Sequence, residues 1–170
     1  MTPSDPGYHI PSTPDIFVGR NDFVQEIVSK IHERKHVALI GSGGIGKSSI
    51  AKAVMHNKHI VSFFGFHRCF VTYDDVATSM MTHNTFLTHL ARALSIADSP
   101  LLTIIAKLRA SPTLLVIDNA ETFLEAGTED VGRIKGAITE LGTVNLFTSF
   151  SRPAVPTCQT FAGYGELLVA

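Results

Sequence analysis

The chain has 170 residues, of which 45% are hydrophobic and 17% charged, a composition that excludes a disordered or collagen-like protein. Its 14 Lys and Arg residues nearly balance 15 Asp and Glu residues, which leaves a formal net charge of −1. Because nucleic-acid-binding domains usually carry a basic excess, this balance predicts no nucleic acid among the partners.

The sequence also favours one compartment. It begins with no basic region followed by an apolar stretch, and no apolar run approaches the roughly 20 residues that cross a bilayer. The 2 cysteines, Cys69 and Cys158, are too few for a disulfide framework and indicate a reducing environment. We therefore expect a cytoplasmic protein with no membrane partner.

The first half of the chain predicts an arm, a helix and a strand. Residues 1–15 hold four prolines, which fix φ and oppose helix, so an extended linker or arm is expected. Asn21 is suited to cap a helix that ends near Lys35, and apolar residues recur in it at helical spacing: Phe23, Val24, Ile27, Val28 and Ile31. The apolar run His36–Ile40 predicts a buried strand. A glycine-rich loop and a helix to about Met55 follow it.

The second half continues the alternation of strands and helices. Strands are expected at residues 66–73, 113–117 and 144–148, and helices at 86–94, 101–108 and 131–141. Only residues 166–170 could supply a further strand. This order predicts a three-layer α/β fold with a mainly parallel sheet flanked by helices. We divide the chain into the arm (1–15), this α/β domain (16–150) and an atypical tail (151–170).

The loop after the first strand carries the strongest signal in the sequence. Gly41-Ser42-Gly43-Gly44-Ile45-Gly46-Lys47-Ser48 fits the pattern G-x-x-x-x-G-K-[ST], between a strand and a helix as phosphate binding requires. Glycines let successive N–H groups turn toward phosphates, and the helix N-terminus favours the anion. Lys47 should reach the β and γ phosphates, and Ser48 should ligate Mg²⁺. We expect the nucleotide to contact the loop and the residue after it: Gly41, Ser42, Gly43, Gly44, Ile45, Gly46, Lys47, Ser48 and Ser49.

An acidic residue completes the predicted magnesium site. The apolar run 114–117 delivers Asp118 at the C-terminal end of a strand, where open α/β sheets bind their ligands. The residue after it, Asn119, cannot serve as a general base. Glu121 could replace it, or could simply begin a loop. Candidate catalytic residues are therefore Lys47 and Glu121. The pair Asp74-Asp75 could form a second acidic site or start a loop.

Three motifs together resemble the STAND class of P-loop NTPases, within the AAA+-related group that includes NB-ARC domains. They are Phe17-Val18-Gly19-Arg20, the loop Gly41–Ser48, and Leu115-Val116-Ile117-Asp118-Asn119-Ala120-Glu121. The resemblance covers about residues 14–149 and is nearest to nucleotide-binding modules of fungal signalling proteins. It implies ATP or ADP with Mg²⁺ as cofactors, and it implies that Val18 and Arg20 contact the adenine.

Two features depart from that family. Relatives follow the fourth strand with a T-x-R sensor, whereas this sequence has Thr148-Ser149-Phe150 and the nearest arginine is Arg152. Relatives also continue into a winged-helix lid and a repeat array. The chain therefore looks truncated after the fourth strand, and an edge of the sheet beside the P-loop strand is expected to stay open.

The sequence leaves several functions open. The first is a nucleotide-dependent signalling switch with slow hydrolysis, acting through self-association or effector proteins. The alternative is a catalytically silent nucleotide-binding or interaction module. An AAA+ DNA-loading ATPase is disfavoured by the charge, and a small-molecule kinase by the absence of a lid with substrate-binding arginines.

Overall fold

The computed structural model describes residues 5–15, 17–98, 100–124, 127–141, 145–150 and 165–169. The strands are β1 His36–Ile40, β2 Arg68–Thr72, β3 Leu114–Asp118, β4 Asn145–Phe150 and β5 Gly165–Val169. The α-helices are α1 Asn21–His32, α2 Lys47–Met55, α3 Lys58–Phe64, α4 His83–Ala93, α5 Leu101–Arg109, α6 Glu121–Leu124 and α7 Thr128–Leu141. A 3₁₀ turn, η1, spans Thr78–Met80.

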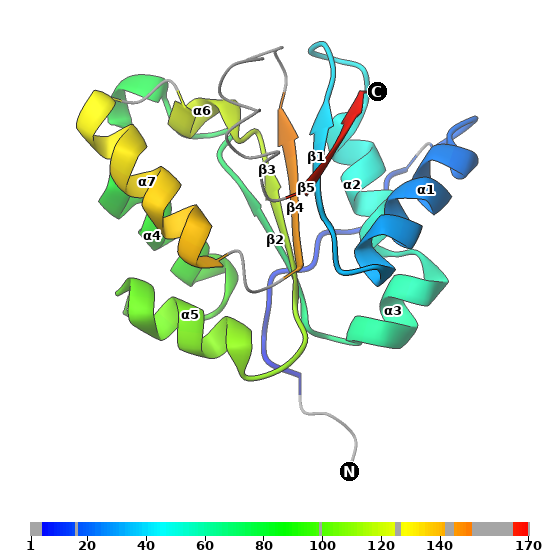
Figure 1. Ribbon diagram of the computed structural model, residues 1–170, viewed down its shortest axis with the longest axis horizontal. Helices are drawn as coiled ribbons and strands as arrows, with labels where there is room; N and C mark the ends of the chain where they lie inside the picture. Colours follow the sequence, from blue (N-terminus) through cyan, green and yellow to red (C-terminus); the bar gives the residue numbers. More distant parts are fainter. Residues whose placement is uncertain are drawn as a thin grey trace.

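The strands form one parallel sheet in the order β2-β3-β4-β1-β5 (Figure 1). The predicted three-layer α/β fold is confirmed. The expectation of a sheet that stops at four strands is wrong, because β5 pairs in parallel with β1 from His36 to Ile40. The P-loop strand therefore has a neighbour on each side, which supplies partners for the backbone groups of both its edges.

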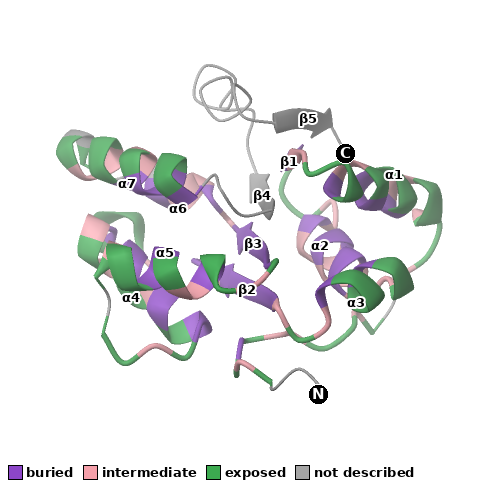
Figure 2. Cartoon of the chain, turned by 60° about the horizontal axis from the view of Figure 1, so that its bottom comes forward, coloured by how far each residue is buried: buried purple, intermediate pink, exposed green. Residues whose placement is uncertain are grey.

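Helices cover both faces of the sheet and bury two apolar cores (Figure 2). Along β3, Leu115 and Ile117 join the core beneath α4, α5 and α7, whereas Leu114 and Val116 join the core beneath α1, α2 and α3. This alternation follows from the two-residue period of a strand. Burial on both faces accounts for the continuous apolar runs in the sequence.

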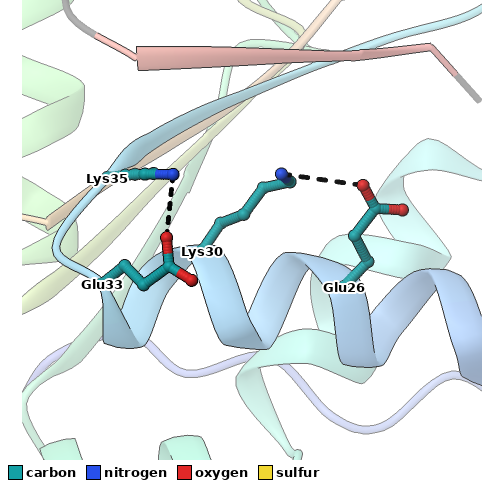
Figure 3. Close-up of polar contacts among 4 residues, drawn as sticks. All are labelled: Glu26, Lys30, Glu33 and Lys35. Atoms are coloured by element: carbon teal, nitrogen blue, oxygen red, sulfur yellow. Dashed lines mark ion pairs between the residues drawn. The ribbon is translucent and has the colours of Figure 1, made fainter.

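Helix α1 buries the predicted apolar face, but its start differs from the prediction. Arg20 is the N-cap and makes no side-chain capping bond, and Asn21 is the first helical residue. At the other end of α1, Lys30 pairs with Glu26 at 3.7 Å and Lys35 with Glu33 at 2.8 Å (Figure 3). Surface pairs of this kind contribute only about 0.2–1 kcal/mol each, so burial of the apolar face dominates the stability of α1.

The arm is packed against the domain within its described part, residues 5–15. Tyr8 is buried in the α4–α5 core, and Ile10 packs against the opposite core. Between them His9 donates its N–H to Ala93 O at 2.8 Å and accepts from Phe70 N at 2.9 Å. The arm thus crosses the edge of the sheet at β2 and covers part of that edge strand.

Candidate functional site

The glycine loop follows β1 without interruption and opens α2. Gly44 and Gly46 have φ of 77° and 89°, a left-handed conformation that a side chain would strain. Gly46 is the N-cap of α2, and its carbonyl accepts from Ile50 N at 2.9 Å. Apart from the flanking residues, no heavy atom of the described part of the chain lies within 4 Å of the position that a Cβ would take on Gly43, Gly44 or Gly46. The loop therefore forms an open cradle at a helix N-terminus.

Lys47 is the buried cation of this cradle, with 5% of its surface exposed. Its Nζ donates to Gly41 O at 2.9 Å and to Ser42 O at 2.7 Å. Both partners are neutral carbonyls of the loop itself. Because a buried ammonium is stabilised by an opposite charge, the site favours an anion in the cradle.

The other predicted loop residues flank that lysine. Gly41 is buried, and Ser42, Gly43 and Gly44 are exposed. Ile45, Gly46, Ser48 and Ser49 are half-buried. Ser48 lies in the first turn of α2, beside the cradle. A hydroxyl in this place could ligate a cation that is bound to phosphate oxygens.

Asp118 lies at the C-terminal end of the parallel strands, the same end of the sheet as the loop. Through Thr148 of β4, Ile117 lies level with Ala38 of β1, two interstrand steps of roughly 4.8 Å away. Asp118 is the next residue and is 1% exposed. A buried carboxylate at this distance across one strand could hold the water shell of a Mg²⁺ ion.

The turn after β3 explains why an asparagine follows Asp118. Asn119 has φ of 55°, and asparagine adopts this left-handed conformation more readily than most residues. The turn carries the chain into α6, which Glu121 begins. Glu121 is half-buried, and its Oε2 has no hydrogen-bond partner among the described residues. A carboxylate oxygen left unpaired at this edge can accept from a bound water.

Asp74 also lies at this end of the sheet. The sequence had left two interpretations of it open, a second acidic site or the start of a loop. Asp74 is an exposed residue, and partial burial of its carboxyl raises the pKa, a hydrogen bond from Thr72 opposes this, and the charges of Asp118, Glu121 and Asp75 raise the pKa further. Asp74 therefore lies within electrostatic reach of both predicted acids. The available signal was its position just after β2, since parallel strands end at one edge.

Segment 17–20 precedes α1, whose N-terminus lies at the P-loop end of the sheet (Figure 1). Phe17 packs against the α1–α3 core, whereas Val18 is 83% exposed. Gly19 has φ of 80°, and Arg20 is half-buried as the N-cap of α1. Val18 thus offers an apolar surface to solvent. The sensor candidate Arg152 lies outside the described residues.

The residues fit a nucleoside phosphate with Mg²⁺. The cradle supplies an open backbone turn and a buried lysine. Across the described residues, no group of three His, Cys, Asp or Glu side chains could hold a metal alone. Magnesium usually keeps several waters and takes one or two protein ligands plus phosphate oxygens, which matches Ser48 and Asp118.

Comparisons with solved structures identify the fold. The chain is similar to the Aeropyrum pernix ORC1 protein in complex with DNA, with a TM-score of 0.65 and 16% identity over 92% of this chain and 46% of that one. It is similar to PCH-2 of C. elegans, with a TM-score of 0.57 and 9% identity over 89% of this chain and 42% of that one. A Walker-type ATPase of Pyrococcus abyssi matches with a TM-score of 0.54 and 13% identity over 91% of this chain and 50% of that one. The chain thus spans half or less of each of these proteins.

One expectation is overturned by these matches. The net charge of −1 predicted no nucleic acid among the partners. The ORC1 protein, whose structure this chain matches, is bound to DNA. Overall charge is therefore a wrong ground for excluding nucleic acid, because a local face can bind DNA on a nearly neutral domain.

In the part of the chain that the structure describes, no helix has the length and apolar character to span a membrane. A search of curated protein sequences gave no significant match. Residues 9–142 match the family model described as Novel STAND NTPase 1. This match spans the arm from His9, the P-loop, Asp118 and Glu121, so the chain belongs to the Novel STAND NTPase 1 family of P-loop NTPases.

Proposed function

We propose that this domain binds ATP or ADP with Mg²⁺ and acts as a signalling switch that hydrolyses ATP slowly, in the manner of NB-ARC domains. The observation that carries the proposal is Lys47, which is 5% exposed and donates to two neutral carbonyls of an open glycine cradle. A phosphate would supply an anion to this buried cation, whose partners among the described residues are both neutral.

The proposed roles follow the arrangement at the edge of the sheet. Backbone N–H groups of Gly41–Ser49 and the Lys47 ammonium bind the phosphates, and Val18 and Arg20 contact the purine. Ser48 and Asp118 hold Mg²⁺, which supplies charge neutralisation of the phosphates. Lys47 stabilises charge on the transferred phosphate, and Glu121 orients a water through its unpaired Oε2.

Slow hydrolysis is proposed because the position after Asp118 carries an amide. Asn119 occupies a left-handed turn and cannot accept a proton from water. Glu121 stands two residues further along, in a helix of four residues. If Glu121 fails to orient water, the domain is a silent nucleotide-binding module instead. In either case we propose self-association or an effector protein as partner. Cys69, a buried free thiol, accords with the proposed cytoplasmic location.

The test is a titration of fluorescent ATP and fluorescent ADP onto the purified chain with Mg²⁺. Lys47→Ala should abolish saturable binding, and Lys52→Ala, on the same helix, should not. Phosphate release then separates the switch from the silent module. A folded wild-type chain that binds neither nucleotide would refute the proposal.

DNA binding is a second candidate, favoured by the match to a DNA-bound ORC1 protein. Fold likeness at 16% identity over 46% of that protein carries no DNA contact over to this chain. Fluorescence anisotropy with a duplex at about 150 mM salt, with and without ATP, decides it. Retention that falls steeply with added salt would support this role.

A further inference from the structure

The arm is anchored first on the α4–α5 side of the sheet. The Tyr8 hydroxyl donates to Lys107 O at 3.3 Å, and its ring meets His67 edge-on at 5.9 Å. Lys107 Nζ lies 5.7 Å from the same ring. Ser95 donates its hydroxyl to Gly7 O. These contacts fix the start of the arm about ten residues before Val18.

A second anchor holds the arm on the other side of the sheet. His56 Nε2 lies 2.7 Å from Pro11 O, and a carbonyl only accepts, so His56 carries a proton on Nε2. His56 is the C-cap of α2, the helix that Lys47 begins. One rigid helix therefore carries the P-loop at its N-terminus and an arm anchor at its C-terminus.

The chain between this anchor and the predicted purine contacts is short. Seven steps from Pro11 to Val18 reach at most about 24 Å. Pro11 and Pro14 have fixed φ, and Phe17 packs against the α1–α3 core. Figure 1 shows the described part of the arm, in dark blue, running from below the sheet toward the side of the molecule where α1 lies. The anchor thus restricts the positions open to Val18, which is 83% exposed.

We propose that the hydrogen bond between His56 and Pro11 is a positioning contact for purine recognition. It holds segment 17–20 in one place relative to α2, so less conformational entropy is lost when a purine binds against Val18. The inference rests on the proposed function, because it requires a nucleotide whose phosphates lie in the P-loop. His56 itself touches no part of that nucleotide.

The experiment separates the contributions of the phosphates and of the purine to the binding affinity. Binding of Mg²⁺ with ATP and of Mg²⁺ with inorganic tripolyphosphate is measured by competition against fluorescent ATP. The variants are His56→Ala and His56→Gln, whose amide can donate to the same carbonyl. His59→Ala is the control, because His59 is exposed on α3 and its ring contacts His32 and not the arm.

His56→Ala should raise the Kd for ATP about three- to tenfold, as expected for one hydrogen bond, and leave the Kd for tripolyphosphate within about twofold. His56→Gln should restore ATP binding, and His59→Ala should change neither ligand. Equal weakening of both ligands, no change in either, or a Gln variant as weak as the Ala variant would overturn the inference alone. A wild-type chain that binds neither ligand would overturn the proposed function and the inference with it.

Discussion

Lys47 donates to the carbonyl of Ser42 at 2.7 Å, across the loop that Lys47 itself closes. The lysine is thus held by its own loop before any phosphate is bound. Its second bond, to Gly41 O at 2.9 Å, has the same character. Of the two carbonyls, that of Ser42 belongs to an exposed residue and can be hydrated instead, whereas Gly41 is buried and its carbonyl would lose a donor without Lys47.

Lys47→Met should therefore remove binding without unfolding the domain. Loss of the charge-assisted bonds to phosphate should weaken the binding of ATP by about 2–4 kcal/mol, which raises the Kd roughly 30- to 1,000-fold. The Gly41 carbonyl left without its donor should lower the free energy of unfolding by about 1–3 kcal/mol, so the melting temperature should fall by several degrees while the domain stays folded. Fluorescent nucleotide titration and differential scanning calorimetry check the two effects, with Lys52→Met as control. Loss of the folded state in Lys47→Met would contradict this expectation.

Arg68 should matter for stability alone. It is 7% exposed, and it donates from Nη1 to Met55 O at 2.5 Å and from Nε to Gly65 O at 2.6 Å. Arg68→Ala leaves both carbonyls without this donor. It should lower the free energy of unfolding, measured with urea, by about 2–4 kcal/mol. Arg68→Lys can serve only one of them and should lose less. Arg92→Ala, exposed on α4, should stay within about 0.5 kcal/mol.

The long apolar elements were predictable because their pattern is local. The bounds of β1 agree with the predicted run His36–Ile40, and α2 ends at the predicted Met55. Helix α7 forms despite Gly132 and Gly136. Both are exposed, so they lower the helix propensity and leave the packing of the buried face unchanged. The alternating elements predicted a parallel sheet, whereas the strand order β2-β3-β4-β1-β5 is known only from the structure.

Short and long-range features could not be predicted in this way. Helix α3 has seven residues rich in β-branched and aromatic side chains, and it forms because Asn57 caps it and Ile60 and Phe64 are buried. The arm carries no periodic pattern, and its Tyr8 hydroxyl bonds to a residue 99 positions away. Of the acidic residues at the C-terminal end of the strands, only part of the arrangement was predicted. Asp118 was identified from its strand, whereas only the fold places Asp74 near it.

Two glycine substitutions should act in opposite directions. Gly46→Ala puts a side chain on a residue with φ of 89° and should cost about 1–2 kcal/mol, with loss of nucleotide affinity. Gly132→Ala lies on the exposed side of α7 with nothing within 4 Å of the new Cβ. It should stabilise the domain by about 0.5–1 kcal/mol and leave affinity unchanged. Equilibrium unfolding of both variants, beside ATP titration, checks the pair.

Asp74 should give the domain a pH-dependent stability term. The pKa of its carboxyl is raised from 3.8 in the folded state, first by burial and then by Asp118, Glu121 and Asp75. The folded state therefore binds this proton more tightly than the unfolded state does. The contribution to stability is fully present below pH 3.8 and is lost as the pH rises through the folded pKa.

Asp74→Asn removes that term, since an amide does not ionise. The variant should melt above the wild type at pH 7, and the difference should shrink as the pH falls toward 4. Asp98→Asn, at an exposed aspartate between α4 and α5, is the matched control for the same change of side chain. Melting temperatures from pH 4 to 8 measure the effect. Saturating ATP with Mg²⁺ should also reduce the difference in melting temperature between the variant and the wild type at pH 7. The proposed Mg²⁺ ion would offset the repulsion between Asp74 and the neighbouring carboxylates. A variant that melts below the wild type at pH 7, with a difference that disappears as the pH falls, would show that Asp74 stabilises the fold as a carboxylate.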